Sequence, residues 1–204
     1  MLHQNSILPP ALDILNRVMS DPEYNAFALV GGTALALQIG HRISVDLDFF
    51  GDRAVDTDDF FELIHSLGEV RLMTKSRYIL VLDVHGIKVD FVHYRYEWLK
   101  PPVISGKIRL ASLQDIGAMK LAAITGRGRK RDFLDLYFLL KQFSLRDLLK
   151  FYHEKYPDGS EFLVLRSLTY FADAEPDDDP KMLIPTDWEK VKKSILQEVR
   201  TIEI

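Results

Sequence analysis

The chain has 204 residues, of which 47% are apolar and 27% are charged, a composition typical of one globular domain or two small ones. The net charge of −4 gives no general attraction to nucleic acid, no apolar run reaches the ~20 residues that span a bilayer, and the first residues lack a signal-peptide pattern. The absence of cysteine excludes disulfides and thiolate metal sites, so any metal ligands should be oxygen or imidazole. A chain without disulfides fits the reducing cytoplasm, where we expect the protein, and without a membrane-spanning run we expect no membrane partner.

Residues 1–100 carry the alternating patterns of a mixed α/β domain. The elements expected there, in chain order, are a helix at 11–19, a strand at 27–30, a helix at 33–39, a strand at 44–50, a helix from Asp56 or Thr57 to Leu67, and strands at 69–74, 78–84 and 87–93. Pro9 and Pro10 suit the first turn of the first helix, and Gly40 ends the second. His85 and Gly86 indicate a two-residue hairpin between the last two strands. Together these elements predict a largely sequential sheet.

Pro101 and Pro102 mark a change to a helical region over residues 101–204. Ser112 and Asp115 have the spacing of a capping box that opens a helix to about Thr125. Further helices are expected at 130–143, 145–156, 161–171 and 188–200. The acidic run at 172–180, which contains proline, is expected to be a solvated loop.

A glycine pair and an acidic pair stand close together in the sequence, in Val30-Gly31-Gly32-Thr33 and Asp46-Leu47-Asp48-Phe49. On a strand, residues two apart face the same side, so Asp46 and Asp48 project together. A divalent cation such as Mg²⁺ relieves the repulsion between two such carboxylates. Paired glycines before a helix let phosphates approach the backbone. Either motif alone is better explained as a plain strand-to-helix turn or as surface aspartates on an edge strand, but the two in this order favour metal-assisted nucleotide chemistry.

The same residues resemble a known signature. The strings Gly31-Gly32-Thr33-Ala34-Leu35 and His41-Arg42-Ile43-Ser44-Val45-Asp46-Leu47-Asp48-Phe49-Phe50 resemble the DNA polymerase β-like nucleotidyltransferase superfamily, and especially its AbiEii/AbiGii-type toxin branch, which includes the MenT-like toxins. The resemblance covers residues 27–140. It implies an α+β fold, with a mixed-sheet nucleotidyltransferase core at 1–100 and a helical bundle at 101–204 that completes the nucleotide site. It also implies transfer of a nucleoside monophosphate from an NTP to an acceptor hydroxyl.

The resemblance further implies a site for Mg²⁺ or Mn²⁺. Asp46, Asp48 and Asp90 would be its catalytic residues and metal ligands, with Asp90 on the strand at 87–93. Asp83, on the preceding strand, is the alternative to Asp90. The nucleotide-binding residues that the resemblance assigns are Gly31, Gly32, Thr33, Arg42, Ser44, Lys120 and Asp132.

Lys120 and Asp132 also have ordinary interpretations. Lys120 lies near the centre of an apolar helix, where it either binds the triphosphate or extends its charge to water. Asp132 either orients Lys120 or an arginine, or is a favourable charge near a helix N-terminus. A basic cluster surrounds them in sequence and could hold phosphates or an RNA backbone, or could be a solvated loop. It comprises Lys120, Arg127, Arg129, Lys130 and Arg131.

The resemblance implies a tRNA or other RNA acceptor, or a protein hydroxyl, and a toxin with a separately encoded antitoxin. Two alternatives stay open. One is phosphoryl transfer to a serine or threonine of the chain itself, for which Thr33 and Ser44 are candidates. The other is a non-catalytic nucleotide-binding module. Comparing α-labelled with γ-labelled NTP discriminates the first alternative, because only nucleotidyl transfer moves the α-phosphate.

Overall fold

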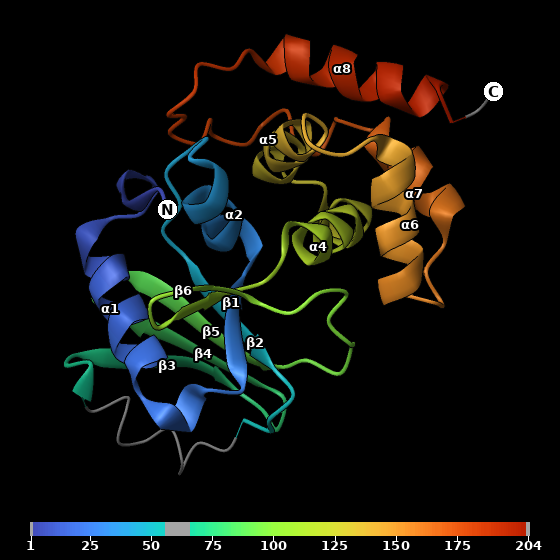
Figure 1. Ribbon diagram of the computed structural model, residues 1–204. Helices are drawn as coiled ribbons and strands as arrows, with labels where there is room; N and C mark the ends of the chain where they lie inside the picture. Colours follow the sequence, from blue (N-terminus) through green and yellow to red (C-terminus); the bar gives the residue numbers. More distant parts are fainter. Residues whose placement is uncertain (1, 56–65, 203–204) are drawn as a thin grey trace. The chain divides into compact units, whose positions relative to one another are not determined.

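The computed structural model of the chain describes residues 2–55 and 66–202 (Figure 1). The chain divides into two compact units. The sheet unit comprises Met1–Tyr96 and Pro102–Ala111, and the helical unit comprises Glu97–Pro101 and Ser112–Ile204. The return of residues 102–111 to the sheet unit was not foreseen from the sequence. Most of the helix expected from Asp56 or Thr57 to Leu67, namely residues 56–65, lies outside the described residues.

The sheet unit is built on a mixed seven-stranded sheet with the order β3-β4-β5-β2-β1-β7-β6. The strands are β1 Phe27–Val30, β2 Leu47–Gly51, β3 Val70–Lys75, β4 Ile79–Val84, β5 Ile87–His93, β6 Val103–Ser105 and β7 Ile108–Leu110. β2 pairs with β5, and β1 with β7, in parallel; the other pairs are antiparallel. The largely sequential sheet was therefore wrong at the β5–β2 and β1–β7 junctions, where strands distant in sequence meet.

Two α-helices of the sheet unit bury apolar residues against the sheet. α1 (Pro9–Ser20) begins with its two prolines, as expected, and buries Ala11, Ile14, Leu15, Val18 and Met19. α2 (Gly31–Ile39) follows β1 without a loop, so both glycines lie in its first turn, and Gly40 ends it in the left-handed conformation. Figure 1 shows both helices beside the sheet. Two short 3-10 helices, Gln4–Ser6 and Pro22–Tyr24, complete the described helices of this unit.

The aromatic core lies beneath β2 and β5. Phe49 of β2 stacks on Phe91 of β5 with ring centroids 5.0 Å apart, and Phe27 of β1 meets Phe91 edge-on at 5.6 Å. All three side chains are fully buried. Because strand side chains alternate between faces, this packing directs Asp48 and Asp90 to the opposite face of the sheet.

Two local predictions have different outcomes. The hairpin between β4 and β5 turns at His85 and Gly86, which both have positive φ (52° and 81°), as a type I′ turn requires. The strand expected at 44–50 begins only at Leu47, because Ser44 makes an isolated bridge to Ile7 and the chain joins the sheet after Asp46. Asp46 and Asp48 therefore do not share a strand.

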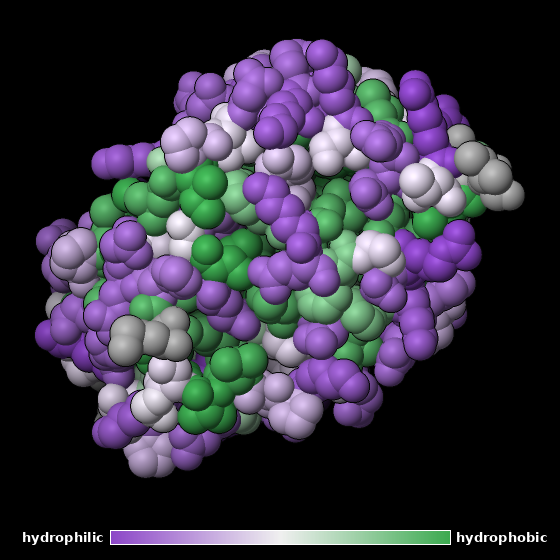
Figure 2. All heavy atoms as spheres, turned by 45° about the horizontal axis from the view of Figure 1, so that its top comes forward, coloured by the Kyte–Doolittle hydropathy of each residue, from purple (hydrophilic) through white to green (hydrophobic). Residues whose placement is uncertain are grey.

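The helical unit contains α4 (Leu113–Arg127), α5 (Lys130–Leu139), α6 (Leu145–Lys155), α7 (Glu161–Leu168) and α8 (Trp188–Arg200). α4 packs against α5, α6 and α7, and α8 packs on α5 and α7. α8 buries Val191, Ile195 and Val199 along one stripe. The outer surface of α8 is largely hydrophilic (Figure 2). Within the described residues, no helix is both long and apolar enough to cross a membrane.

A buried ion pair fixes the segment 97–101 to this unit. Ser112 caps α4 by accepting the backbone N–H of Asp115, which is one half of the expected capping box. The Asp115 carboxylate, however, also accepts the backbone N–H groups of Leu99 and Lys100. Lys155 Nζ lies 2.7 Å from Asp115 Oδ1, and both side chains are fully buried. Asp115 thus joins the segment 97–101 to α4 and α6 as well as serving the cap.

Candidate active site

The centre of the candidate site is the acidic pair, Asp48 and Asp90. The two residues are register partners on the parallel strands β2 and β5. Register partners on neighbouring strands project from the same face of a sheet, so the two carboxylates are neighbours. Both are partly accessible, whereas Leu47, Phe49, Val89 and Phe91 beside them are buried. The pair is thus held on a rigid apolar base.

Gly31 brings the start of α2 against this pair. Gly31 has φ +68°, a conformation that favours glycine, and a Cβ placed there would lie 2.6 Å from Asp48 Oδ2. Val30, just before it, is the β1 register partner of Asp48. The Asp48 carboxylate therefore lies against the backbone of Gly31, at the N-terminus of α2. The first N–H groups of a helix have no acceptor within it and attract anions.

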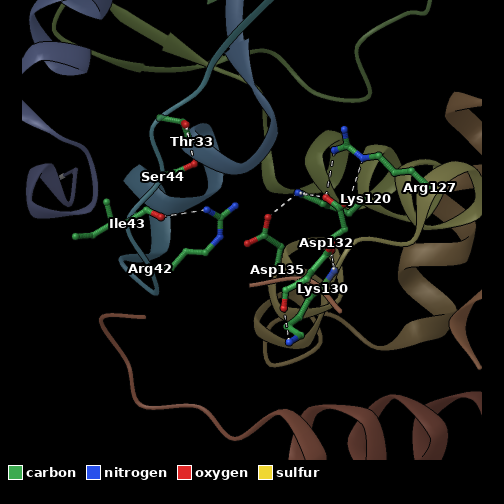
Figure 3. Close-up of polar contacts among 10 residues, drawn as sticks. Thr33, Arg42, Ile43, Ser44, Lys120, Arg127, Lys130, Asp132 and Asp135 are labelled. Atoms are coloured by element: carbon green, nitrogen blue, oxygen red, sulfur yellow. Dashed lines mark hydrogen bonds and ion pairs between the residues drawn. The ribbon is translucent and has the colours of Figure 1, made fainter. Parts of the chain in front are cut away.

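Thr33 secures the chain before β2. Its hydroxyl donates to the backbone carbonyl of Asp46 and lies 2.9 Å from Ser44 Oγ (Figure 3). Thr33 is only 1% exposed and Ser44 is also buried. The pair therefore ties the first turn of α2 to residues 44–46 and sets the position from which Asp46 projects. The resemblance assigns Thr33 to nucleotide binding, and the structure gives its hydroxyl this additional structural role.

Arg42 is also largely buried. Its Nη1 donates to the backbone carbonyl of Ile43 at 3.2 Å (Figure 3). The neighbouring His41 is fully buried. Both residues lie in the connection between α2 and β2, which also contains Ser44, the partner of Thr33.

The acidic pair fits a divalent cation. Asp90 Oδ1 is buried and has no hydrogen-bond partner within residues 2–55 and 66–202. Lys88 Nζ contacts the other oxygen of this carboxylate. An orphaned carboxylate oxygen beside a second carboxylate is the kind of ligand that Mg²⁺ or Mn²⁺ takes. No group of three or more potential metal-ligating side chains is assembled among the described residues, so the three-acid site with Asp46 stays a prediction.

Lys88 is a site residue that sequence reasoning missed. It lies two positions before Asp90 on β5, and this spacing places both side chains on one face of the strand. The alternation of the run at 87–93 already carried that signal. Lys88 leaves one oxygen of Asp90 for a ligand and supplies a positive charge beside it.

Asp83 is engaged elsewhere. Its Oδ2 lies 3.2 Å from Arg71 Nη2 on β3, and its Oδ1 accepts the backbone N–H of Gly86 in the hairpin turn. Its register partner on β5 is Lys88. Asp83 thus stabilises the β3–β4–β5 meander, and Asp90 is the better partner for Asp48.

In the helical unit, Lys120 lies between two carboxylates. Its Nζ is 2.8 Å from Asp132 Oδ1 and 2.6 Å from Asp135 Oδ2 (Figure 3). Arg127 Nε contacts Asp132 Oδ2 at 3.1 Å. Lys120 and both carboxylates are buried, whereas the Arg127 side chain is 54% exposed. Lys120 therefore does not extend its charge to water. Asp132 contacts both a lysine and an arginine, as an orienting residue would.

The charges of this group set the ionisation of Asp132. Burial raises its pKa, but the positive charges of Lys120 and Arg127 and their hydrogen bonds outweigh burial, and the net pKa is lowered. Asp132 is therefore ionised in the folded protein at neutral pH. One carboxylate and two cations would leave the group positive, and Asp135 supplies the compensating charge.

The acidic run at 172–180 is a loop, as expected, but it is attached to the basic cluster. Asp177 Oδ1 lies 2.7 Å from Arg129 Nη1, and its Oδ2 accepts the backbone N–H of Lys130. Lys130 Nζ reaches Asp179 at 3.1 Å. The opposite charges of residues 127–131 and 173–179 are the sequence feature from which this contact could have been predicted. Much of the cluster's charge is thus matched within the helical unit.

A family model described as "Nucleotidyl transferase AbiEii toxin, Type IV TA system" matches residues 13–72 and 69–203. The chain belongs to this family. It is a nucleotidyltransferase. An uncharacterized protein of Aquifex aeolicus is 35% identical to it over 194 residues, covering 92% of this chain and 93% of the relative.

Solved structures share the fold. JHP933 from Helicobacter pylori superimposes with a TM-score of 0.59 at 19% identity, covering 97% of this chain and 93% of JHP933. The antibiotic-resistance factor ANT(2'')-Ia superimposes with a TM-score of 0.54 at 13% identity, covering 69% of this chain and 88% of that protein. The α+β fold, with a polymerase β-like sheet unit and a helical C-terminal region, is therefore confirmed.

Proposed function

We propose that this AbiEii-family enzyme transfers a nucleoside monophosphate from an NTP to a hydroxyl of tRNA or another RNA in a divalent-metal-dependent reaction. The observation that carries the proposal is the acidic pair at the start of α2. Asp48 and Asp90 are in register, Asp48 lies on the backbone of Gly31, and Asp90 has a buried oxygen without a partner in the described part of the chain.

Asp48 and Asp90, with Asp46 from the segment that Thr33 secures, are the proposed ligands of Mg²⁺ or Mn²⁺. Such an ion, when bound, neutralises phosphate charge and lowers the pKa of an attacking hydroxyl. The acceptor hydroxyl gives up its proton to a carboxylate of the acidic pair or to water. Its oxygen bonds to the α-phosphorus, the bond from that phosphorus to the oxygen that bridges to the β-phosphate breaks, and pyrophosphate leaves. The work of the chain itself is to position the reactants and match their charge.

The remaining assignments concern the nucleotide. Gly31 and Gly32 begin α2, whose N-terminus favours phosphate oxygens. Thr33, Ser44 and Arg42 hold the α2–β2 connection around it. For Lys120 and Asp132 we propose that the pair orients Arg127, whose exposed guanidinium is available to a phosphate.

The biological role proposed is that of the toxin of a toxin–antitoxin pair, acting in the cytoplasm with a separately encoded antitoxin. The description of the matched family supports it. Expression of the active enzyme should arrest growth, and the arrest should be lost with Asp48→Asn. Growth arrest by that variant at equal protein level would contradict the role.

The transfer itself is tested with labelled nucleotides. The purified protein is incubated with total RNA, Mg²⁺ and each NTP labelled at either the α- or the γ-phosphate. We expect small RNA to gain α-label and no γ-label, and Asp46→Ala and Lys120→Ala to reduce or abolish the labelling. Label transferred from the γ-phosphate to the protein would favour self-phosphorylation instead. The burial of Thr33 and its bond to the Asp46 carbonyl argue against modification at that residue.

A further inference from the structure

The helical unit contains a cavity whose lining residues, apart from Arg127, have no role in the transfer proposed here. It lies between the C-terminal turn of α4 and the end of α7, and its volume is about 490 Å³. Sites for small molecules have volumes of roughly 300–1,000 Å³. Two arginines, Arg127 and Arg166, line it together with Tyr170 and Asp173. The cavity thus combines cations, an aromatic face and a hydrogen-bond acceptor.

The charges of the cavity favour a phosphate-bearing ligand. Arg127 shares the buried Asp132 carboxylate and remains half-exposed. Arg166 is exposed, and none of the residues that the structure describes gives its side chain an ion pair. An unpaired guanidinium binds a phosphate in bidentate geometry more readily than a carboxylate-paired one. Asp173 would oppose a second phosphate there but can accept from a ribose hydroxyl or a base amine.

Exposed aromatic side chains lie on α7 and just after it, in the segment that lines one side of the cavity. Tyr170 is 57% exposed and Phe162, one turn before Arg166 on α7, is 70% exposed. Residues four apart on a helix share a face, so Phe162 and Arg166 lie on one side of α7. Solvent-exposed aromatic rings beside cations are the usual surface of proteins that bind single-stranded nucleic acid.

We propose that this cavity, which Arg127, Arg166 and Tyr170 line, binds a nucleotide of a single-stranded nucleic acid. One base stacks on Tyr170, and the guanidinium of Arg166 contacts the adjoining phosphate. The proposal rests on the proposed function in one respect: the bound strand is the acceptor RNA of the transfer reaction.

Binding is measured without NTP, by fluorescence anisotropy of a labelled single-stranded RNA of about ten nucleotides, a length within the usual site sizes. We expect Tyr170→Ala to weaken binding about tenfold and Tyr170→Phe to restore it, because phenylalanine keeps the stacking face. Arg166→Gln should weaken binding and reduce the salt dependence of log Kd by about 0.7, the loss of one phosphate contact on a single strand. Lys193→Gln, on the exposed face of α8, removes the same charge and should change neither.

The residues are exposed, so melting temperatures should be unchanged and loss of binding will not reflect unfolding. Unaltered RNA affinity in both Tyr170→Ala and Arg166→Gln would overturn the proposal, as would an equal loss in Lys193→Gln. The two proposals fail separately. If RNA is labelled by the wild type while its binding ignores the cavity, the inference fails and the function stands. If binding needs the cavity but no RNA is ever labelled, the function fails and the cavity remains a nucleic-acid site.

Discussion

At the scale of single residues, Gly31 couples backbone conformation to the acidic pair. An alanine there must adopt a left-handed φ, at about 1–3 kcal/mol, and its Cβ must displace the Asp48 carboxylate. We therefore expect Gly31→Ala to lower both the free energy of unfolding and the transfer activity. The control is Gly126→Ala in α4, where a Cβ meets open space, so urea unfolding should show no loss. A Gly31→Ala protein with wild-type activity would separate Gly31 from the site.

Asp132 gives a prediction with a pH signature. Because its folded pKa is lowered, its ionisation stabilises the fold fully above the unfolded pKa of about 3.9, and this stability is lost as the pH falls through the folded value. Asp132→Asn should cost about 3–5 kcal/mol at pH 7, as breaking a buried ion pair does. The deficit relative to the wild type should shrink below about pH 4.

The matched control for Asp132 is Asp13→Asn, which removes an exposed contact with Arg17. That change should cost about 0.3–0.5 kcal/mol or less. Urea unfolding followed from pH 3 to pH 7 measures both. If Asp132→Asn loses no more stability than Asp13→Asn, the ion pairs of Asp132 with Lys120 and Arg127 do not stabilise the fold.

At the scale of elements, Arg109 joins four parts of the sheet unit. Its guanidinium donates to the carbonyls of Met19 at the end of α1, Tyr24, Phe27 of β1 and Lys107. Burial lowers its pKa. A cation bonded to carbonyls of a helix C-terminus also suits the helix dipole.

We expect Arg109→Gln to lower the free energy of unfolding by about 2 kcal/mol or more, because several charge-assisted hydrogen bonds are lost together. The neighbouring exposed Lys107→Gln should have an effect below about 0.5 kcal/mol. Denaturant unfolding of the two variants gives the comparison. Equal stabilities would mean that β1, α1 and β7 are held by apolar packing alone.

Sequence patterns predicted elements well where periodicity was long. α1, β5 and α8 lie where apolar spacing and capping signals placed them, and the β4–β5 turn follows from its two residues. β6 and β7 were missed because strands of three residues are too short to show alternation. The alternation of residues 44–50 predicts a strand that includes Asp46. The sequence cannot reveal that Ser44 bridges to Ile7 and that β2 begins only at Leu47.

At the scale of the whole molecule, the predicted site residues divide between the two units. The glycine pair, Thr33, Arg42, Ser44 and the three aspartates belong to the sheet unit, and Lys120 and Asp132 to the helical unit. Local spacing made the aspartates candidates. Asp90 is one of them because the alternation of buried and accessible residues along β5 can be predicted from the sequence. The pairing of β2 with β5 is long-range, and so the choice of Asp90 over Asp83 depends on register that spacing alone does not contain.

The most direct measurement of the central claim compares three isosteric variants in the α-labelled transfer assay. Asp48→Asn and Asp90→Asn remove the acidic pair, whereas Asp83→Asn changes an aspartate on the neighbouring strand that serves the hairpin. We predict a loss of at least about a hundredfold for the first two at saturating Mg²⁺, as expected when charge stabilisation at the reacting centre is removed, and near-normal transfer for Asp83→Asn. Wild-type transfer by Asp48→Asn or Asp90→Asn would contradict the assignment of the active site.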